Sequence, residues 1–272
     1  MNFETRVQSL ASLIEQEVAD YFFLDTCVIG MDFIKDNNGI VLSVDAAVRN
    51  NIRPDKLKMG LRSVDALLGI IKGYANIGVT AEVVEELETR QKILETCAKN
   101  YGRYGRHDRS KQRVHGSSMY TSGQRKEREM LARLVDKERE IMEMLSPRVF
   151  PTTRTESLRS YEQFVIAASQ SLGDDVDKNI RNELLVAKAM YKMIKDGQKI
   201  ALVSNNSRMK GIALRTQMVL ARTKDDNREI YDALRGGRFT IIAGITKERG
   251  FYIDHRSEEF REMPIAVAAA FE

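Results

Sequence analysis

Four oxygen-bearing side chains, far apart in the sequence, stand where strands are expected to end or where helices are expected to begin. They are Asp25, Glu86, Glu183 and Asn206. Carboxylates gathered at one end of a sheet repel each other and need a hard cation, and Mg²⁺ or Mn²⁺ prefers oxygen ligands. A site of this kind can polarise a phosphodiester and activate water, which is the metal-assisted hydrolysis of nucleases.

Asp25 lies in the apolar run 21–29, which has no helical spacing of polar residues and therefore favours a strand buried on both faces. Burying an unpaired carboxylate costs several kcal/mol, so we expect Asp25 at the carboxyl end of this strand, beside a donor, a cation or water. Open α/β sheets bind their ligands at these ends. The alternative is that Asp25 caps the helix that follows.

Strands alternate with helices along the chain, which predicts an α/β fold, a three-layer α/β/α sandwich around a mainly parallel central sheet. Residues 223–237 are interpreted as a charged connection, and the tail at 251–253 as a candidate edge strand. Strands are expected at 21–29, 75–80, 199–204 and 238–245, and helices at 4–18, 55–74, 81–99, 125–145, 157–171, 178–195 and 210–222.

We expect residues 1–272 to form a single domain with an inserted basic loop and helical arm at 95–150 and a C-terminal extension at 246–272. Within the insertion, residues 99–128 carry nine basic residues against two acids, with three tyrosines interleaved. Cations suit phosphates and tyrosines stack on unpaired bases, so this segment predicts a nucleic-acid contact. Its candidate phosphate ligands are Arg103, Arg106, Lys111 and Arg113. The alternative is a solvated loop without a partner.

Composition limits the class of protein. Two cysteines are too few for a disulfide framework or a Cys-type zinc site, and no apolar run approaches the length of a membrane span. We therefore expect a soluble, cytoplasmic protein without a membrane partner. His107, His115 and His255 lack metal-ligand spacing and are interpreted as surface residues. The sequence has no P-loop, dinucleotide fingerprint or nucleophile elbow, which argues against motors, dehydrogenases and serine hydrolases.

The chain resembles the PIN-domain family of nucleases in three blocks. The first is Leu-Asp-Thr-Cys-Val-Ile at 24–29, and the second is Thr-Ala-Glu-Val-Val-Glu-Glu-Leu at 80–87. The third joins Glu-Leu-Leu-Val-Ala at 183–187 to Ala-Leu-Val-Ser-Asn-Asn at 201–206, one helix later. The resemblance places the family's acids at Asp25, Glu86 and Glu183, with Asn206 and Ser204 completing the site or orienting water. The neighbouring Glu82 and Glu85 are interpreted as solvated surface.

The resemblance implies a PIN-like fold and a metal-dependent endonuclease that uses Mg²⁺ or Mn²⁺, leaves 5′-phosphate and 3′-hydroxyl ends, and acts on single-stranded RNA. Two departures from the family pattern matter. Glu183 replaces an Asp, and Asn206 replaces an Asp and removes one negative charge, which predicts weaker metal affinity, Mn²⁺ dependence or no catalysis. A nearby acid, Asp174, Asp175 or Asp177, either substitutes for it or caps a helix.

Two other functions remain open at this point. A catalytically silent PIN fold would bind RNA or scaffold a complex, and Asn206 is its best support. A phosphohydrolase with an aspartate nucleophile needs a second acid two residues after Asp25, where the chain has Cys27. RNA is the expected partner in the first two cases, and a homo-oligomer is compatible with any of them.

Overall fold

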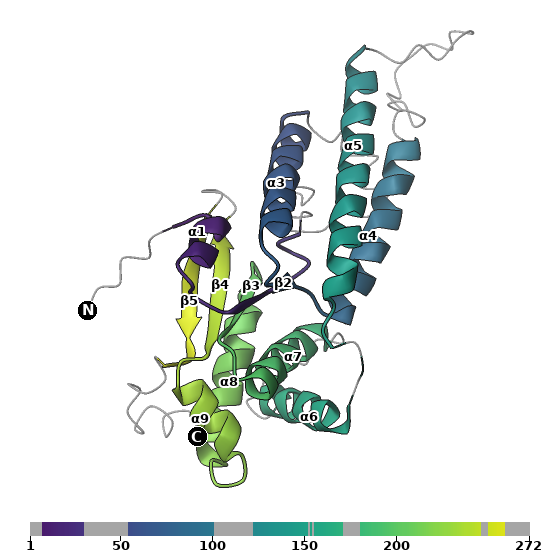
Figure 1. Ribbon diagram of the computed structural model, residues 1–272. Coiled ribbons are helices and arrows are strands. Elements are labelled where there is room, and N and C mark those ends of the chain that lie inside the picture. The colour runs from purple at the N-terminus through teal and green to yellow at the C-terminus, as the bar shows by residue number, and fades with distance from the viewer. Residues whose placement is uncertain are drawn as a thin grey trace, which may run out of the picture. The chain divides into compact units, whose positions relative to one another are not determined.

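The computed structural model describes residues 7–29, 54–100, 122–151, 153, 155–170, 180–245 and 250–258 of the chain. The chain divides into two compact units (Figure 1). The first comprises Met1–Val28, Tyr74–Val84 and Pro147–Glu272, and the second comprises Ile29–Gly73 and Glu85–Ser146. The second unit therefore takes in residues 29–73 as well as most of the segment that the sequence predicts as an inserted arm.

The first unit contains a five-stranded sheet in the order β2-β1-β3-β4-β5. The first four strands in sequence pair in parallel, and the last pairs antiparallel with β4 at one edge of the sheet. An α/β fold with a mainly parallel sheet and an edge strand near 251–253 is thus confirmed. The strands are β1 (Tyr21–Leu24), β2 (Ile77–Gly78), β3 (Ile200–Ser204), β4 (Phe239–Ile245) and β5 (Gly250–Arg256).

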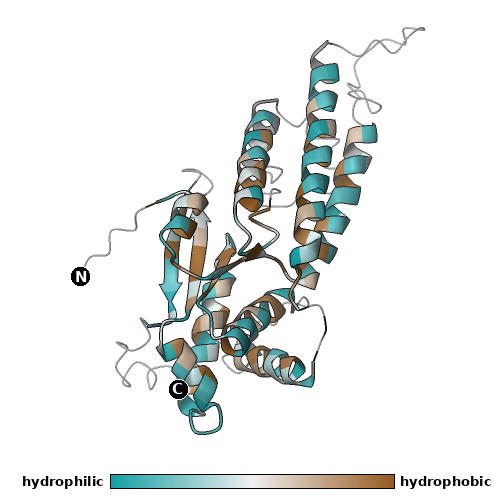
Figure 2. Ribbon diagram, viewed as in Figure 1, coloured by the Kyte–Doolittle hydropathy of each residue, from teal (hydrophilic) through white to brown (hydrophobic). Residues whose placement is uncertain are grey.

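The parallel strands form because their residues are apolar on both faces, so the sheet is buried between layers of side chains. Every residue of β3 is buried, as are Phe22, Phe23 and Leu24 of β1, and Figure 2 shows the hydrophobic colouring of these strands. Leu24 pairs with Val203 in register, so the next residues, Asp25 directly after β1 and Ser204 at the end of β3, lie side by side.

The first strand is shorter than the apolar run predicts. It ends at Leu24, and residues 26–29 form a turn in which the Val28 amide donates to the Asp25 carbonyl at 3.0 Å. Strand β2 is also shorter than expected, with only Ile77 and Gly78. A β-carbon at Gly78 would lie 1.8 Å from the Tyr21 hydroxyl, so only glycine fits beside that tyrosine.

Helices of the first unit pack around this sheet in a mutually contacting group formed by α6, α7 and α8, and α7 also packs on β3. Helix α9 lies in the segment that the sequence analysis interprets as a charged connection, so that interpretation is wrong. The sequence analysis overlooked α9 because only three of the eight residues of this helix are buried and the others are largely charged. The helices are α1 (Leu10–Glu15), α6 (Glu156–Gln170), α7 (Arg181–Asp196), α8 (Arg208–Arg222) and α9 (Arg228–Arg235).

The second unit is helical in its described part. Helix α3 (Pro54–Gly73) packs against α5 (Ser122–Leu145), and α4 (Ala81–Asn100) begins in the first unit and continues into this one. Leu131, Leu134 and Ile141 of α5 are fully buried, whereas the rest of that helix is largely hydrophilic (Figure 2). Ion pairs support the packing, including Lys72–Glu140 at 2.6 Å and Arg139–Glu95 at 2.8 Å. Within the described ranges, no helix combines the length and apolar character needed to cross a membrane.

Candidate functional site

Asp25 and Ser204 meet at the carboxyl ends of two neighbouring parallel strands. The backbone amide of Asp25 donates to the carbonyl of Val203 at 3.0 Å, which continues the ladder for one residue beyond β1. The Ser204 hydroxyl donates to Asp25 Oδ2 at 2.6 Å, and both side chains are buried. A hydroxyl–carboxylate bond of this length is a strong, charge-assisted one. The position at a strand end and the contact with a donor are those that the sequence predicts for Asp25.

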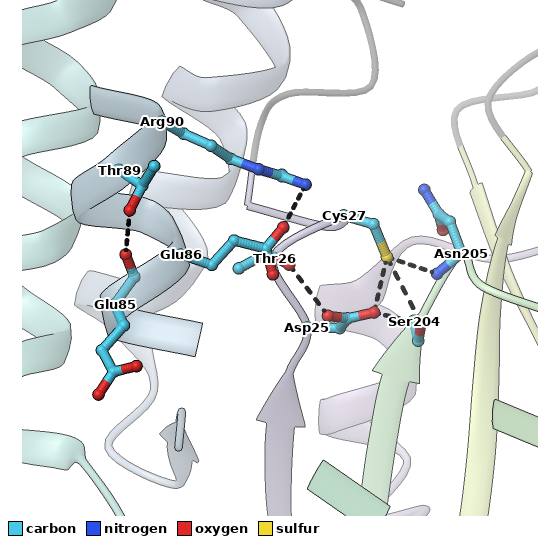
Figure 3. Close-up of polar contacts among 9 residues, drawn as sticks. All are labelled: Asp25, Thr26, Cys27, Glu85, Glu86, Thr89, Arg90, Ser204 and Asn205. Carbon is cyan, nitrogen blue, oxygen red and sulfur yellow. Dashed lines mark hydrogen bonds and ion pairs between the residues drawn. The ribbon is translucent and has the colours of Figure 1, made fainter. Parts of the chain in front are cut away.

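Two further side chains donate to the same carboxylate. Cys27 Sγ lies 2.9 Å from Asp25 Oδ2, and Thr26 Oγ1 donates to Oδ1 at 3.2 Å (Figure 3). Burial, together with the neighbouring charge of Asp25, raises the pKa of the Cys27 thiol, which therefore stays protonated and acts as a donor. The backbone amide of Asn205 in turn donates to Cys27 Sγ at 3.0 Å. The sequence analysis overlooked both donors because it placed them inside the strand.

The loop after β3 is held in place by the same serine. The Asn206 amide donates to Ser204 Oγ at 3.0 Å, and Asn206 Oδ1 accepts from the Arg208 amide at 3.1 Å at the start of α8. The Asn206 side chain therefore contacts the backbone of the helix that follows. Gly244 of β4 makes room for this loop, since a β-carbon there would lie 1.9 Å from Asn205 Oδ1.

Glu183 lies in the first turn of α7 and is only 6% exposed. Its Oε1 accepts from Ser169 Oγ of α6 at 3.3 Å. Its Oε2 is buried and has no hydrogen-bond partner among the residues that the structure describes. An unsatisfied buried carboxylate oxygen costs free energy, so a cation bound at this atom would be stabilising. Glu183 is thus a buried acid of the first unit with an oxygen available to a ligand.

Glu86 belongs to the second unit, where it forms an ion pair with Arg90 one helical turn later (Figure 3). The guanidinium lies 2.6 Å from Glu86 Oε1, and the Glu86 side chain is 28% exposed. Its neighbour Glu85 is exposed, as the sequence predicts. The carboxylate that the resemblance assigns to a metal is therefore paired with a cation of its own chain in this structure.

A buried lysine forms a second polar cluster in the first unit. Lys188 of α7 is 5% exposed and forms an ion pair with Glu82 in the first turn of α4, while Glu162 of α6 lies 3.9 Å from its Nζ. Burial acts to raise the pKa of Glu82, but the hydrogen bond and charge of Lys188 lower it overall. The interpretation of Glu82 as solvated surface is therefore wrong. The sequence signal for this ion pair is indirect: Lys188 stands among the apolar residues of the inner face of α7.

His255 is a second correction, because the sequence analysis interprets it as a surface residue. It lies in β5, is 3% exposed, and contacts Gln217 Oε1 of α8 through Nε2 at 3.1 Å. Burial, with a smaller contribution from the nearby Lys210, lowers its pKa to about 4. His255 is thus a neutral, hydrogen-bonded core residue at neutral pH.

Several predicted residues lie outside the described ranges. They are Arg103, Arg106, Lys111 and Arg113 of the basic segment, His107 and His115 beside them, and the acids Asp174, Asp175 and Asp177. Among the residues that are described, no group of three or more His, Cys, Asp or Glu side chains is arranged to hold a metal ion. The structure brings Asp25 together with Ser204, and it pairs Glu183 and Glu86 with Ser169 and Arg90 respectively.

Comparisons of the chain with models of protein families, with curated proteins and with solved structures find no match.

Proposed function

We propose that this chain is a divalent-metal-dependent endonuclease with a PIN-like three-layer sandwich, and that it hydrolyses phosphodiester bonds in single-stranded RNA. One observation carries the proposal. A buried carboxylate, Asp25, stands at the carboxyl end of a central parallel strand, and the neighbouring strand supplies Ser204 to orient it. Such strand ends are where open α/β sheets bind ligands.

The donor set suits a hard cation. Asp25 and Glu183 both belong to the first unit, both offer carboxylate oxygens, and Glu183 Oε2 is buried with no partner in the described part of the chain. Mg²⁺ and Mn²⁺ bind oxygen ligands of this kind and retain waters for a phosphate. Glu86, the third acid that the resemblance assigns, belongs to the second unit, where Arg90 is its ion-pair partner.

The residues of the site would have the following roles in the proposed hydrolysis. A bound divalent ion supplies charge stabilisation at the phosphate and lowers the pKa of a water. Asp25 would hold the ion, and three donors, from Ser204, Cys27 and Thr26, fix the direction of its carboxylate. Ser204 also accepts from the Asn206 amide, so the loop that follows β3 is fixed relative to the carboxylate. The basic segment 99–128 would guide the strand.

A second candidate is a PIN-like fold that binds RNA without cleaving it. Two observations favour it. Arg90 occupies a carboxylate oxygen of Glu86, and Asn206, which stands where the family pattern has an acid, uses its side-chain oxygen on the backbone of α8. Both would reduce the negative charge available to a metal.

The test is cleavage of a labelled single-stranded RNA by the full chain in Mn²⁺, with D25N as the key variant. We expect cleavage by the unmodified chain, none by D25N, and none in EDTA. D225N, the same change at an exposed aspartate between α8 and α9, is the matched control and should cleave normally. Cleavage that survives D25N would contradict the proposal, and RNA binding without cleavage would favour the second candidate.

A further inference from the structure

A ladder of alternating charges runs along the packed helices α3 and α5 of the second unit. Lys72 of α3 forms an ion pair with Glu140 of α5 at 2.6 Å, and Glu140 lies 3.9 Å from Lys137 of the same helix. Lys137 in turn lies 3.1 Å from Asp65 of α3. Every cation of this ladder therefore contacts an acid. Because the two ion pairs between the helices follow the same order along both, α3 and α5 run in the same direction.

The ion pairs also indicate which earlier residues of the two helices stand at the same level. Seven residues make almost two turns of an α-helix, so residues seven apart lie within about 20° of the same side and about 10 Å apart along the axis. Counting back two such steps from the ion pair of Lys72 leads to Lys58 on α3 and to Lys126 on α5. Two lysines thus occupy the level at which the ladder would need a cation and an acid.

Two arginines add to the positive charge at this end of the helix pair. Arg62 stands one turn before Asp65 on α3, and Arg133 stands one turn before Lys137 on α5. The four residues, named the α3–α5 cation group, are Lys58, Arg62, Lys126 and Arg133. All four side chains are exposed, and none has a hydrogen-bond or ion-pair partner within the part of the chain that the structure describes.

The nearest described acid of α5 does not neutralise this group. Glu129 stands between Lys126 and Arg133 along the helix, but its ion pair is with Arg125, at 3.1 Å. Like charges at neighbouring helix positions are slightly destabilising, so the α3–α5 cation group contributes nothing to the packing of α3 on α5. A bound polyanion would relieve this repulsion, as phosphates do for the lysines and arginines of nucleic-acid-binding surfaces.

We infer that the α3–α5 cation group binds phosphates of a single-stranded nucleic acid, with Lys58 and Lys126 as its principal contacts. Lys126 belongs to the basic segment 99–128, so the group extends onto two packed helices the nucleic-acid contact that the sequence predicts for that segment. The inference rests on the proposed function for the identity of the anion. It requires neither a metal nor cleavage.

The test measures binding of a fluorescent single-stranded oligouridylate to the full chain in EDTA at several salt concentrations, so that no metal-dependent cleavage interferes. Each phosphate contact that is lost should reduce the slope of log affinity against log salt by about 0.7 for a single strand. We therefore expect K58Q/K126Q to reduce the slope by about 1.4 and to weaken binding on the order of tenfold at about 0.1 M salt.

Two controls separate this group from bulk charge and from packing. K72Q/K137Q removes the same charge from the same two helices, but from lysines that are paired with acids, and should leave the slope unchanged. K58R/K126R keeps the charge and should retain the slope of the unmodified chain. Melting temperatures add a second readout: K72Q/K137Q breaks ion pairs and should melt slightly lower, whereas K58Q/K126Q removes like charges and should not.

Three results would overturn the inference: an unchanged slope in folded K58Q/K126Q, an equal loss in K72Q/K137Q, or no binding of oligouridylate by the unmodified chain at low salt. Its failure is distinguishable from that of the nuclease proposal. Loss of slope in K58Q/K126Q without any cleavage in Mn²⁺ would leave the phosphate site established and the nuclease rejected. Cleavage that requires Asp25, with an unchanged slope in K58Q/K126Q, would do the reverse.

Discussion

One buried carboxylate from each unit, Asp25 and Glu138, shows two different ways in which the chain accommodates such a group. Asp25 in the first unit and Glu138 of α5 in the second are 7% and 5% exposed. Asp25 accepts from three side chains of its own turn and the neighbouring strand. Glu138 Oε1 has no hydrogen-bond partner among the described residues, and burial raises the pKa of Glu138 to about 8, with Arg90 opposing the rise.

The difference shows that burial alone does not mark a functional acid. A buried carboxylate that is supplied with donors is held in a fixed direction, which suits a ligand for a cation. Glu138, whose buried Oε1 has no donor among the described residues, instead has a raised pKa and behaves as a neutral core residue at neutral pH. The two units should therefore respond differently to pH, to substitution and to metal. Measuring each response tests whether the environments of Asp25 and Glu138 differ in this way.

The largest effect is expected from E138Q. Between pH 4.5 and about 8 the folded chain holds a proton on Glu138 that the unfolded chain has lost, so the free energy of unfolding falls as pH rises through this window. Each unit of pKa difference corresponds to about 1.4 kcal/mol, so the total amounts to a few kcal/mol. E138Q is neutral at every pH and should be more stable than the unmodified chain at pH 8, with little difference at pH 4.5.

The measurement for E138Q is urea unfolding at both pH values, with hydrogen exchange of α5 to localise the change in the second unit. The matched control is E140Q on the same helix. Glu140 is paired with Lys72, whose hydrogen bond lowers the pKa of Glu140, so this variant should show a slight loss of stability at pH 8 rather than a gain. A gain in E140Q equal to that in E138Q would contradict the comparison.

His255 should give the first unit a pH response of the opposite sign. Its folded pKa of about 4 lies below the ordinary 6.5, so the unfolded chain binds the extra proton between these values and stability is lost as pH falls through them. The loss should approach about 3 kcal/mol at pH 4, by the same conversion. In H255Q the acid limb of the stability curve should be shallower. An acid limb identical to that of the unmodified chain would show that His255 does not cause it.

S204A tests the donors of Asp25 directly. Removing the 2.6 Å bond to a buried carboxylate should lower the free energy of unfolding by about 2 kcal/mol, the usual range for a hydrogen bond to a charged group. S160A, which removes an exposed serine bond to the Glu156 carbonyl, should change stability by less than about 0.5 kcal/mol. Thermal unfolding of both variants at pH 7 gives the comparison. Equal stability of S204A and S160A would mean that Asp25 does not depend on this donor.

The parts of the fold and of the candidate site that could be predicted are those with local signals in the sequence. Apolar runs and helical spacing predicted β3, β4 and α3 through α8 closely, because burial of those faces is encoded residue by residue. The sequence also predicted that Asp25 ends a strand beside a donor. The identity of that donor depends on pairing between residues 179 positions apart, and no local pattern contains it.

Other features depend on tertiary contacts alone. His255 is buried because β5 packs beside Gln217 of α8, which the sequence around either residue does not show. The ion pair of Lys188 joins three helices, so Glu82 alone resembles an ordinary solvated acid at a helix start. The division into two units, with residues 29–73 joined to 85–146, likewise follows from contacts between segments distant in the sequence.

The smallest expected effect comes from adding metal. A ligand that binds only the folded chain raises the free energy of unfolding by about 1.4 kcal/mol at ten times its dissociation constant. If Asp25 and Glu183 hold a divalent ion, Mn²⁺ should raise the melting temperature of the unmodified chain. Mn²⁺ should have no such effect on E183Q, because the amide of glutamine cannot supply the charge of Glu183 Oε2. E138Q should respond to Mn²⁺ as the unmodified chain does, because a protonated core carboxyl attracts no cation. A melting temperature that rises equally in E183Q would place the ion elsewhere, whereas a rise that disappears only in E138Q would mean that Glu138, and not Glu183, is the ligand.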